Sequence, residues 1–202
     1  MRTDPAKRLT ILSDAEKLAL YGRPDFDEFQ RAEYFALTEA ELHLVQARQG
    51  TMEQVYCLLQ LGYFKAKQAF FRFTGSEVPP EDLAFILSRY FPGVVLNLHP
   101  IRENEVYAQR GAITDYFGFR LWAAADQAPW VGKVSLWARR DVTATFLLAE
   151  LVASLNAEKI VRPGYTTLQT IIAEALAVER RRLEQAVEAA LDDTTQKALD
   201  QL

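Results

Sequence analysis

The chain has 202 residues, 50% of them hydrophobic and 25% charged, which suits one or two small cores and argues against a disordered or low-complexity protein. One cysteine, Cys57, and two histidines exclude an intramolecular disulfide and a zinc site of the usual kind, and no apolar run approaches the ~18 residues of a membrane helix. The net charge of −4 is not typical of nucleic-acid binding, yet residues 48–140 carry eleven Lys or Arg against eight Asp or Glu, which permits a local anion-binding face.

Helix signals follow one another along nearly the whole chain. Capping boxes occur at residues 13–16, 38–41 and 51–54, prolines can open helices at Pro24 and Pro80, and glycines follow several apolar runs. Asp141 and then Thr166 or Thr167 are expected to cap later helices. The expected helices cover residues 13–21, 24–34, 38–47, 51 to between 64 and 70, 79–90, 104–117, 126–138, 141–157 and 166–191.

Residues 94–100 (VVLNLHP) form the only β-like stretch, and we interpret them as an extended connector because the run is isolated and ends at a proline. The predicted fold class is therefore all-α, with two small helical bundles of helix-turn-helix character and a long C-terminal helix. The best linker candidate is residues 74–80. We expect domain boundaries that give segments 1–75, 76–164 and 165–202.

Residues 38–64 have the pattern of a helix-turn-helix, with Gly50 supplying a short turn between two helices. In the second helix, Met52, Val55, Leu58, Leu59, Gly62 and Ala66 share one inward face, because they recur at helical spacing. Tyr56, Gln60 and Lys67 are expected on a different, polar face. Glutamine can contact adenine with two hydrogen bonds and lysine can neutralise a phosphate. A helical hairpin inside a bundle would show the same pattern.

Three further groups of basic residues could contact nucleic acid. Lys65, Lys67 and Arg72 alternate with phenylalanines that either stack on bases or belong to the core. Arg139 and Arg140 precede the Asp141 cap, where a helix N-terminus can bind phosphate or the loop is merely solvated. Residues 180–182 (RRR) lie beside Glu179 and Glu184, which favours a solvated, ion-paired face.

Catalytic patterns are absent from the sequence. It contains no glycine-rich phosphate loop, no G-x-S-x-G and no paired catalytic carboxylates. His43 and His99 have no carboxylate at a metal-ligand spacing, and Cys57 has no nearby histidine. We therefore expect a protein that is not itself an enzyme.

Five segments in order resemble replicative transposases of the Tn-three type. They are LTILSDAE at residues 9–16, YFALTEAEL at 34–42, LLQLGYFKAK at 58–67, ITDYFGFR at 113–120 and IVRPGYTTL at 160–168. The resemblance covers nearly the whole chain. It implies the N-terminal DNA-binding region of such a transposase, whose magnesium-dependent Asp-Asp-Glu site lies in a C-terminal half that no stretch here matches.

The resemblance implies that segments 1–75 and 76–164 are DNA-binding domains and that 165–202 connects them to the catalytic region. It implies double-stranded DNA, the terminal inverted repeats of the transposon, as the partner. It also implies self-association in the full-length transposase, no membrane contact, no cofactor in this chain and a location in the bacterial cytoplasm at the nucleoid. The candidate DNA-binding residues are Arg48, Gln49, Thr51, Gln54, Tyr56, Gln60, Lys65, Lys67, Arg72, Arg139 and Arg140.

The alternative function is a helical scaffold for protein–protein contact, for example in transposase dimerisation, with DNA read elsewhere. The acidic segment 166–202 favours that role locally.

Overall fold

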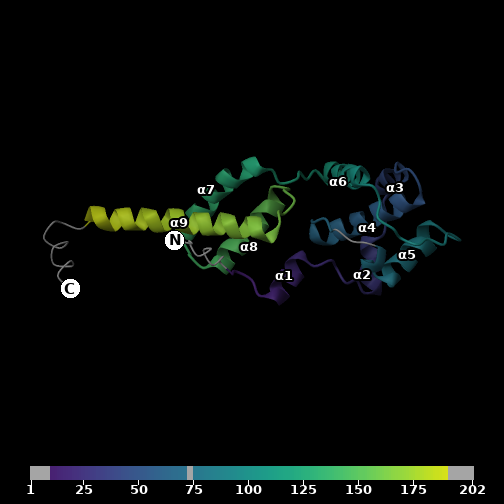
Figure 1. Ribbon diagram of the computed structural model, residues 1–202, viewed down its shortest axis with the longest axis horizontal. Coiled ribbons are helices and arrows are strands. Elements are labelled where there is room, and N and C mark those ends of the chain that lie inside the picture. Colours follow the sequence, from purple (N-terminus) through teal and green to yellow (C-terminus); the bar gives the residue numbers. More distant parts are fainter. Residues whose placement is uncertain (1–9, 72–74, 191–202) are drawn as a thin grey trace, which may run out of the picture. The chain divides into compact units, whose positions relative to one another are not determined.

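The computed structural model describes residues 10–71 and 75–190. These residues form helices and no strand, so the all-α prediction is confirmed (Figure 1). The α-helices are α1 (Asp14–Tyr21), α2 (Glu28–Tyr34), α3 (Glu39–Gln46), α4 (Thr51–Lys67), α5 (Pro80–Tyr90), α6 (Glu103–Phe117), α7 (Gln127–Ala138), α8 (Ala144–Ala157) and α9 (Tyr165–Ala190), and short 3₁₀ helices cover Gly75–Glu77 and Ala124–Asp126. Residues 94–100 form a connector without regular structure, as expected.

Several helix ends follow the predicted local chemistry. The Ser13 hydroxyl accepts a hydrogen bond from the Glu16 amide at 3.3 Å, and the Glu16 carboxylate accepts one from the Ser13 amide at 2.8 Å. Thr38 caps α3 in the same reciprocal way. Helix α6 ends at Gly118, whose φ of 68° lies in the left-handed region that favours glycine.

Two helix starts and one helix cap differ from the prediction. Helix α2 begins at Glu28 rather than near Pro24, because Asp27 and Gln30 form a capping box that the prediction did not include. Helix α4 has Gly50 as its N-cap and no side-chain cap, so the box expected at Thr51 is absent. Helix α8 begins at Ala144, because the Asp141 side chain accepts from the Thr143 amide at 2.7 Å in a turn before the helix.

Contacts divide the chain into two compact units, each of which is described by itself. Among the described residues, unit 1 contains 10–17, 122–157 and 163–190, and unit 2 contains 18–71, 75–121 and 158–162. This grouping follows contacts between distant segments and does not coincide with the expected domain boundaries. Those boundaries stay a prediction.

Helix α4 is the central helix of unit 2. It contacts α2, α3, α5 and α6 (Figure 1), and each residue from Val55 to Phe64 is buried. Gly62 lets the Phe35 ring approach closely, since a Cβ at this position would overlap that ring. Because neighbours surround α4, its burial extends well beyond the single apolar face that the sequence pattern predicts.

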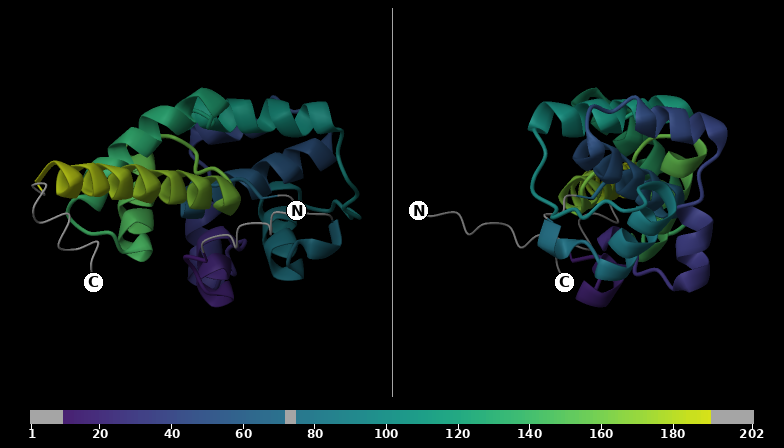
Figure 2. Two further views of the ribbon diagram at one scale, coloured as in Figure 1. Left: turned by 60° about the vertical axis from the view of Figure 1, so that its left-hand side comes forward. Right: turned by 90° about the vertical axis from the view of Figure 1, so that its right-hand side faces the viewer.

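Unit 1 is built around the long helix α9. Figure 2 shows α7 and α8 beside α9, and both helices contact it. The buried face of α9 contains Leu168, Ile171, Ile172 and Ala175, which recur at helical spacing. Trp130 of α7 is 2% exposed and meets Trp137 edge-on, with 6.5 Å between the ring centroids. The seven-residue spacing of the two tryptophans is therefore a packing feature.

Candidate nucleic-acid interface

The turn between α3 and α4 is short and well defined. Gly50 has φ of 90° and ψ of 152°, a conformation that favours glycine. The side-chain amide of Gln54 donates to the Arg48 carbonyl at 3.1 Å and thereby closes the turn. Gln49 is exposed, whereas Arg48 and Thr51 are half-buried. The turn and the first residues of α4 are the accessible part of the predicted helix-turn-helix.

The expectation that Tyr56 and Gln60 lie on an exposed polar face is wrong. Tyr56 is 4% exposed and Gln60 is 5% exposed. The Gln60 amide donates to the Phe71 carbonyl at 2.6 Å, and its oxygen accepts from the Phe71 amide at 3.4 Å. Gln60 therefore supplies both hydrogen-bond partners of the Phe71 backbone, and it is a buried structural residue.

The lysines at the end of α4 are held by groups of the protein itself. The Lys65 ammonium donates to the Glu41 carboxylate at 2.8 Å and to the Ala36 carbonyl at 2.7 Å. The Lys67 ammonium donates to the Ala19 carbonyl at 2.8 Å. Arg72, the third member of the predicted basic cluster, lies outside the described residues.

Of the phenylalanines near this cluster, Phe64, Phe70 and Phe71 pack in the core instead of forming a stacking platform, and Phe73 lies outside the described residues. Phe64 is 1% exposed and Phe71 is 8% exposed. Phe64 stacks on Phe70 at 4.9 Å and on Phe117 at 5.5 Å between ring centroids. This agrees with the core alternative that the sequence left open.

A polar cleft beside the α3–α4 turn contains two basic residues, His99 and Arg102, that are absent from the predicted DNA-binding residues. Its volume is about 510 Å³, and its lining residues are Gln49, Glu53, His99, Pro100, Ile101, Arg102 and Glu105. His99 and Arg102 are exposed. Glu105, one of the two glutamates that line the cleft, lies 3.8 Å from the Arg48 guanidinium and forms an ion pair with it. Only a fold that packs α6 against α4 brings residues 99–105 to Gln49, and no local motif signals this.

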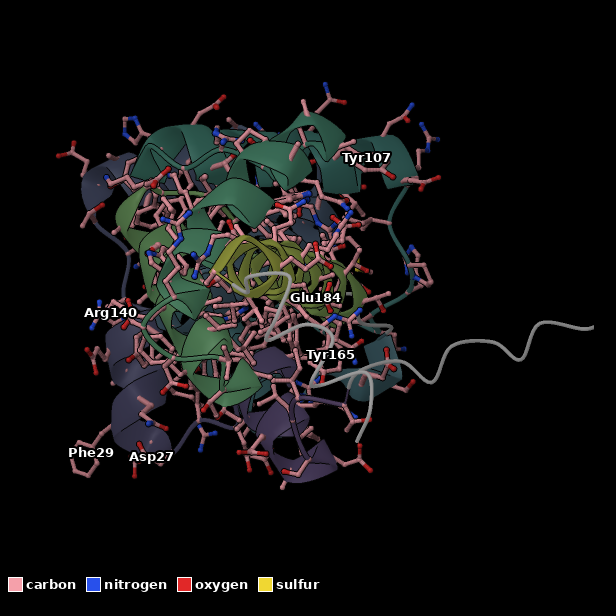
Figure 3. All side chains as sticks on the ribbon, turned by 90° about the vertical axis from the view of Figure 1, so that its left-hand side faces the viewer. Asp27, Phe29, Tyr107, Arg140, Tyr165 and Glu184 are labelled. Carbon is pink, nitrogen blue, oxygen red and sulfur yellow. The ribbon has the colours of Figure 1, made fainter. Side chains whose placement is uncertain are left out.

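In unit 1, Arg139 and Arg140 lie at the end of α7, where the sequence predicted a phosphate contact. Arg140, labelled in Figure 3, is exposed, and its guanidinium lies 5.9 Å from the ring centroid of Phe146 in α8. Hydrogen bonds from Thr143 lower the pKa of Asp141, which keeps a negative charge beside these arginines. Arg180 pairs with Glu184 at 3.6 Å and Arg182 with Glu179 at 2.6 Å, so the expected ion-paired face is present.

The described residues contain no cluster of three or more histidine, cysteine or carboxylate side chains that could hold a metal. Cys57 is buried, and burial raises the pKa of its thiol to about 12, which makes it a packing residue and a poor nucleophile. Asp82 is buried against the Tyr63 hydroxyl at 2.9 Å and Arg31 at 3.4 Å, which is a structural network. None of the described helices combines the length and the apolar character that crossing a bilayer requires.

Two comparisons with known proteins bear on this chain. Residues 11–175 match the model of a family described as a domain of unknown function, DUF4158. The chain is also 24% identical, over 203 residues, to the transposase for transposon Tn21 of Escherichia coli. That alignment includes 96% of this chain and 20% of the transposase, so the chain spans about a fifth of that relative's length.

Proposed function

Because the chain belongs to the DUF4158 family and is related to a transposase over nearly its whole length, we propose that it is a DNA-binding part of a transposase. It recognises the terminal inverted repeats of its transposon as double-stranded DNA and needs no cofactor for this. The observation that carries the proposal is the similarity over 96% of the chain to a protein named for transposition. The five ordered segments of the sequence support the Tn-three type.

The proposed base-reading element is the α3–α4 turn. In a helix-turn-helix, the first residues of the second helix face the major groove. Here Gln49 is exposed, and Arg48 and Thr51 flank it at the start of α4. The buried middle of α4 is unsuited to enter a groove, so Tyr56 and Gln60 leave the set of proposed contacts. Gln54, Lys65 and Lys67 act through the turn and the core, while Arg139 and Arg140 contact phosphate.

A gel-shift titration tests the recognition of inverted repeats. The probes are a duplex with the terminal repeat that flanks the coding gene and a scrambled duplex of equal composition. We expect tighter binding to the repeat and a log–log salt slope of about −4 to −7, as for roughly 4–8 phosphate contacts. Gln49→Ala should reduce the preference for the repeat, since a lost base contact costs about 1–3 kcal/mol. Equal affinity for the two duplexes would reject sequence recognition.

We also propose that this chain does not cut or join DNA. Two-metal strand transfer needs convergent carboxylates, and the described residues offer no such cluster. A supercoiled plasmid carrying the repeat, incubated with the chain and magnesium or manganese, should stay intact. Nicking above that of a mock purification would overturn this part of the proposal.

A protein–protein scaffold is the second candidate function, and one observation favours it. Residues 181–190 of α9 are all exposed, including Leu183 at 47% and Val187 at 57%. Apolar side chains on an uncovered helix face are typical of helix pairing. Sedimentation equilibrium distinguishes the candidates: a stable dimer that Leu183→Ser dissociates, together with no preference for repeat DNA, would favour the scaffold.

A further inference from the structure

Two arginines that are far apart in the sequence meet on one carboxylate in unit 1. Glu179 of α9 is 4% exposed. The Arg182 guanidinium, one turn further along α9, donates to both Glu179 oxygens over 2.6 to 3.0 Å. Arg139, the residue that follows α7, brings its Nε to 3.7 Å from the same carboxylate. Nothing in the local sequence links residues 139–140 to residues 180–182.

Both arginines keep a large part of their surface in solvent. The side chain of Arg139 is 53% exposed and that of Arg182 is 44% exposed. A guanidinium has five N–H donors in a rigid fork, so bonds to one carboxylate leave others for a second anion. Two positive charges share the Glu179 carboxylate. Arg140, which follows Arg139 after the end of α7, and Arg181, which precedes Arg182 in α9, are exposed as well.

Stabilisation of the fold explains Arg182 better than it explains Arg139. Helix α7 already packs on α9 through buried Trp130, Val134 and Ala138. The Arg139–Glu179 pair is long and half-exposed, and such pairs contribute little to stability. A guanidinium that is fixed by a buried carboxylate but open to solvent is instead suited to bind phosphate in a defined geometry.

We infer that Arg139 and Arg182, ordered by Glu179, form a phosphate-binding site for the DNA backbone, with Arg140 and Arg181 at its sides. This inference rests on the proposed DNA-binding function, and it extends the phosphate contact proposed for Arg139 and Arg140 to Arg181 and Arg182 of α9. Phosphate contacts position a protein on the duplex and carry no base specificity. The site therefore contributes affinity and salt dependence for any duplex, while the α3–α4 turn selects the sequence.

The test compares Arg139→Ala, Arg182→Ala and the double variant in the 202-residue chain. Arg89→Ala is the matched control, because Arg89 is an exposed arginine of unit 2 whose guanidinium lies 5.8 Å from the Tyr90 ring centroid, and the site does not include it. Fluorescence anisotropy gives Kd for the repeat and the scrambled duplex at several salt concentrations. Each single variant should raise both Kd values roughly threefold and lower the salt slope by about one unit, and the double variant by about two.

Thermal melting and a conservative variant separate contact from folding. Arg139→Lys keeps the charge but loses the fork, so it should retain the salt slope of the wild type and bind less tightly. If the arginine variants have the same Kd values and salt slope as Arg89→Ala, and the wild type still prefers the repeat, the phosphate site is rejected and the proposed sequence recognition stands. If the wild type binds both duplexes equally and the arginine variants bind both more weakly, sequence recognition is rejected and the phosphate site is supported.

Discussion

Arg120 and Ile160 form a parallel backbone bridge that joins the end of α6 to the segment after α8. The Arg120 amide donates to the Lys159 carbonyl at 2.9 Å, and the Val161 amide donates to the Arg120 carbonyl at 2.9 Å. Residues 113–120 and 160–168 are two of the segments that resemble transposases, and the bridge brings the end of the first into contact with the start of the second. This bridge packs against α4 through Phe119, whose ring meets the Phe64 ring edge-on at 5.3 Å between ring centroids.

Gln60→Ala should destabilise the protein without changing which duplex it prefers. The substitution leaves the Phe71 amide and carbonyl without the side-chain partner that now serves both. An unsatisfied buried polar group costs about 1–3 kcal/mol, which chemical denaturation followed by circular dichroism would measure. The ratio of the two Kd values should equal that of the wild type. A stable variant that has lost the preference for the repeat would show that Gln60 reads DNA after all.

Gly62→Ala should be strongly destabilising, because the added methyl group would overlap the Phe35 ring in the core of unit 2. Overpacking of a core typically costs about 1–3 kcal/mol. Gly132→Ala in α7 is the matched control, since a Cβ there meets no atom within 4 Å. That control should gain about 0.5–1 kcal/mol from the higher helix propensity of alanine. Differential scanning calorimetry of both variants checks the opposite signs, and equal melting temperatures would contradict the close packing at Gly62.

Local signals in the sequence predicted the helices well. The boxes at Ser13 and Thr38 involve side chains and amides within four residues of one another, so they are readable without knowledge of the fold. Prolines and glycines gave the ends of α5 and α6 for the same reason. Where a competing local cap existed, as at Asp27, the prediction placed the helix start on the wrong residue.

Much less of the candidate interface could be predicted from the sequence, because its arrangement depends on contacts between distant segments. Helical periodicity assigned Gln60 to a polar face, yet Gln60 is buried and bonds the backbone of Phe71, which follows α4. The same limit applies to Arg139 and Arg182. Periodicity describes one helix at a time, and it cannot reveal that α7 and α9 bring two arginines to Glu179.

Cys57 should be inert to thiol reagents while the protein is folded. Its side chain is fully buried, so a reagent cannot reach the sulfur. Burial also raises the thiol pKa to about 12, so the reactive thiolate does not form at neutral pH. Reaction with Ellman's reagent at pH 8 should proceed only through unfolding, and its rate should rise with added urea. Rapid stoichiometric labelling of the native protein, at a rate that urea does not change, would contradict the buried position of Cys57 in α4.

Asp82→Asn should make the protein progressively more stable than the wild type as the pH rises. Asp82 is fully buried, and this burial raises the pKa of its carboxyl group above the usual value of 3.8, although bonds from Tyr63 and Arg31 partly oppose the shift. The folded state therefore holds the proton more tightly than the unfolded state. The contribution of Asp82 to stability is complete below pH 3.8 and is lost as the pH rises through the raised pKa.

Urea unfolding of both proteins at intervals from about pH 3.5 to 7 measures this difference, which can change by no more than about 1.4 kcal/mol per pH unit for one proton. Glu16→Gln is the control of opposite sign, because hydrogen bonds from Ser13 lower the pKa of Glu16. The wild type should be more stable than Glu16→Gln above the usual pKa of 4.5 and lose this advantage as the pH falls through the lowered value. The free energies of unfolding relative to the wild type should thus diverge in favour of Asp82→Asn and against Glu16→Gln as the pH rises. A difference for Asp82→Asn that stays constant over the range would mean that Asp82 keeps its charge in the core, held by Arg31 and Tyr63.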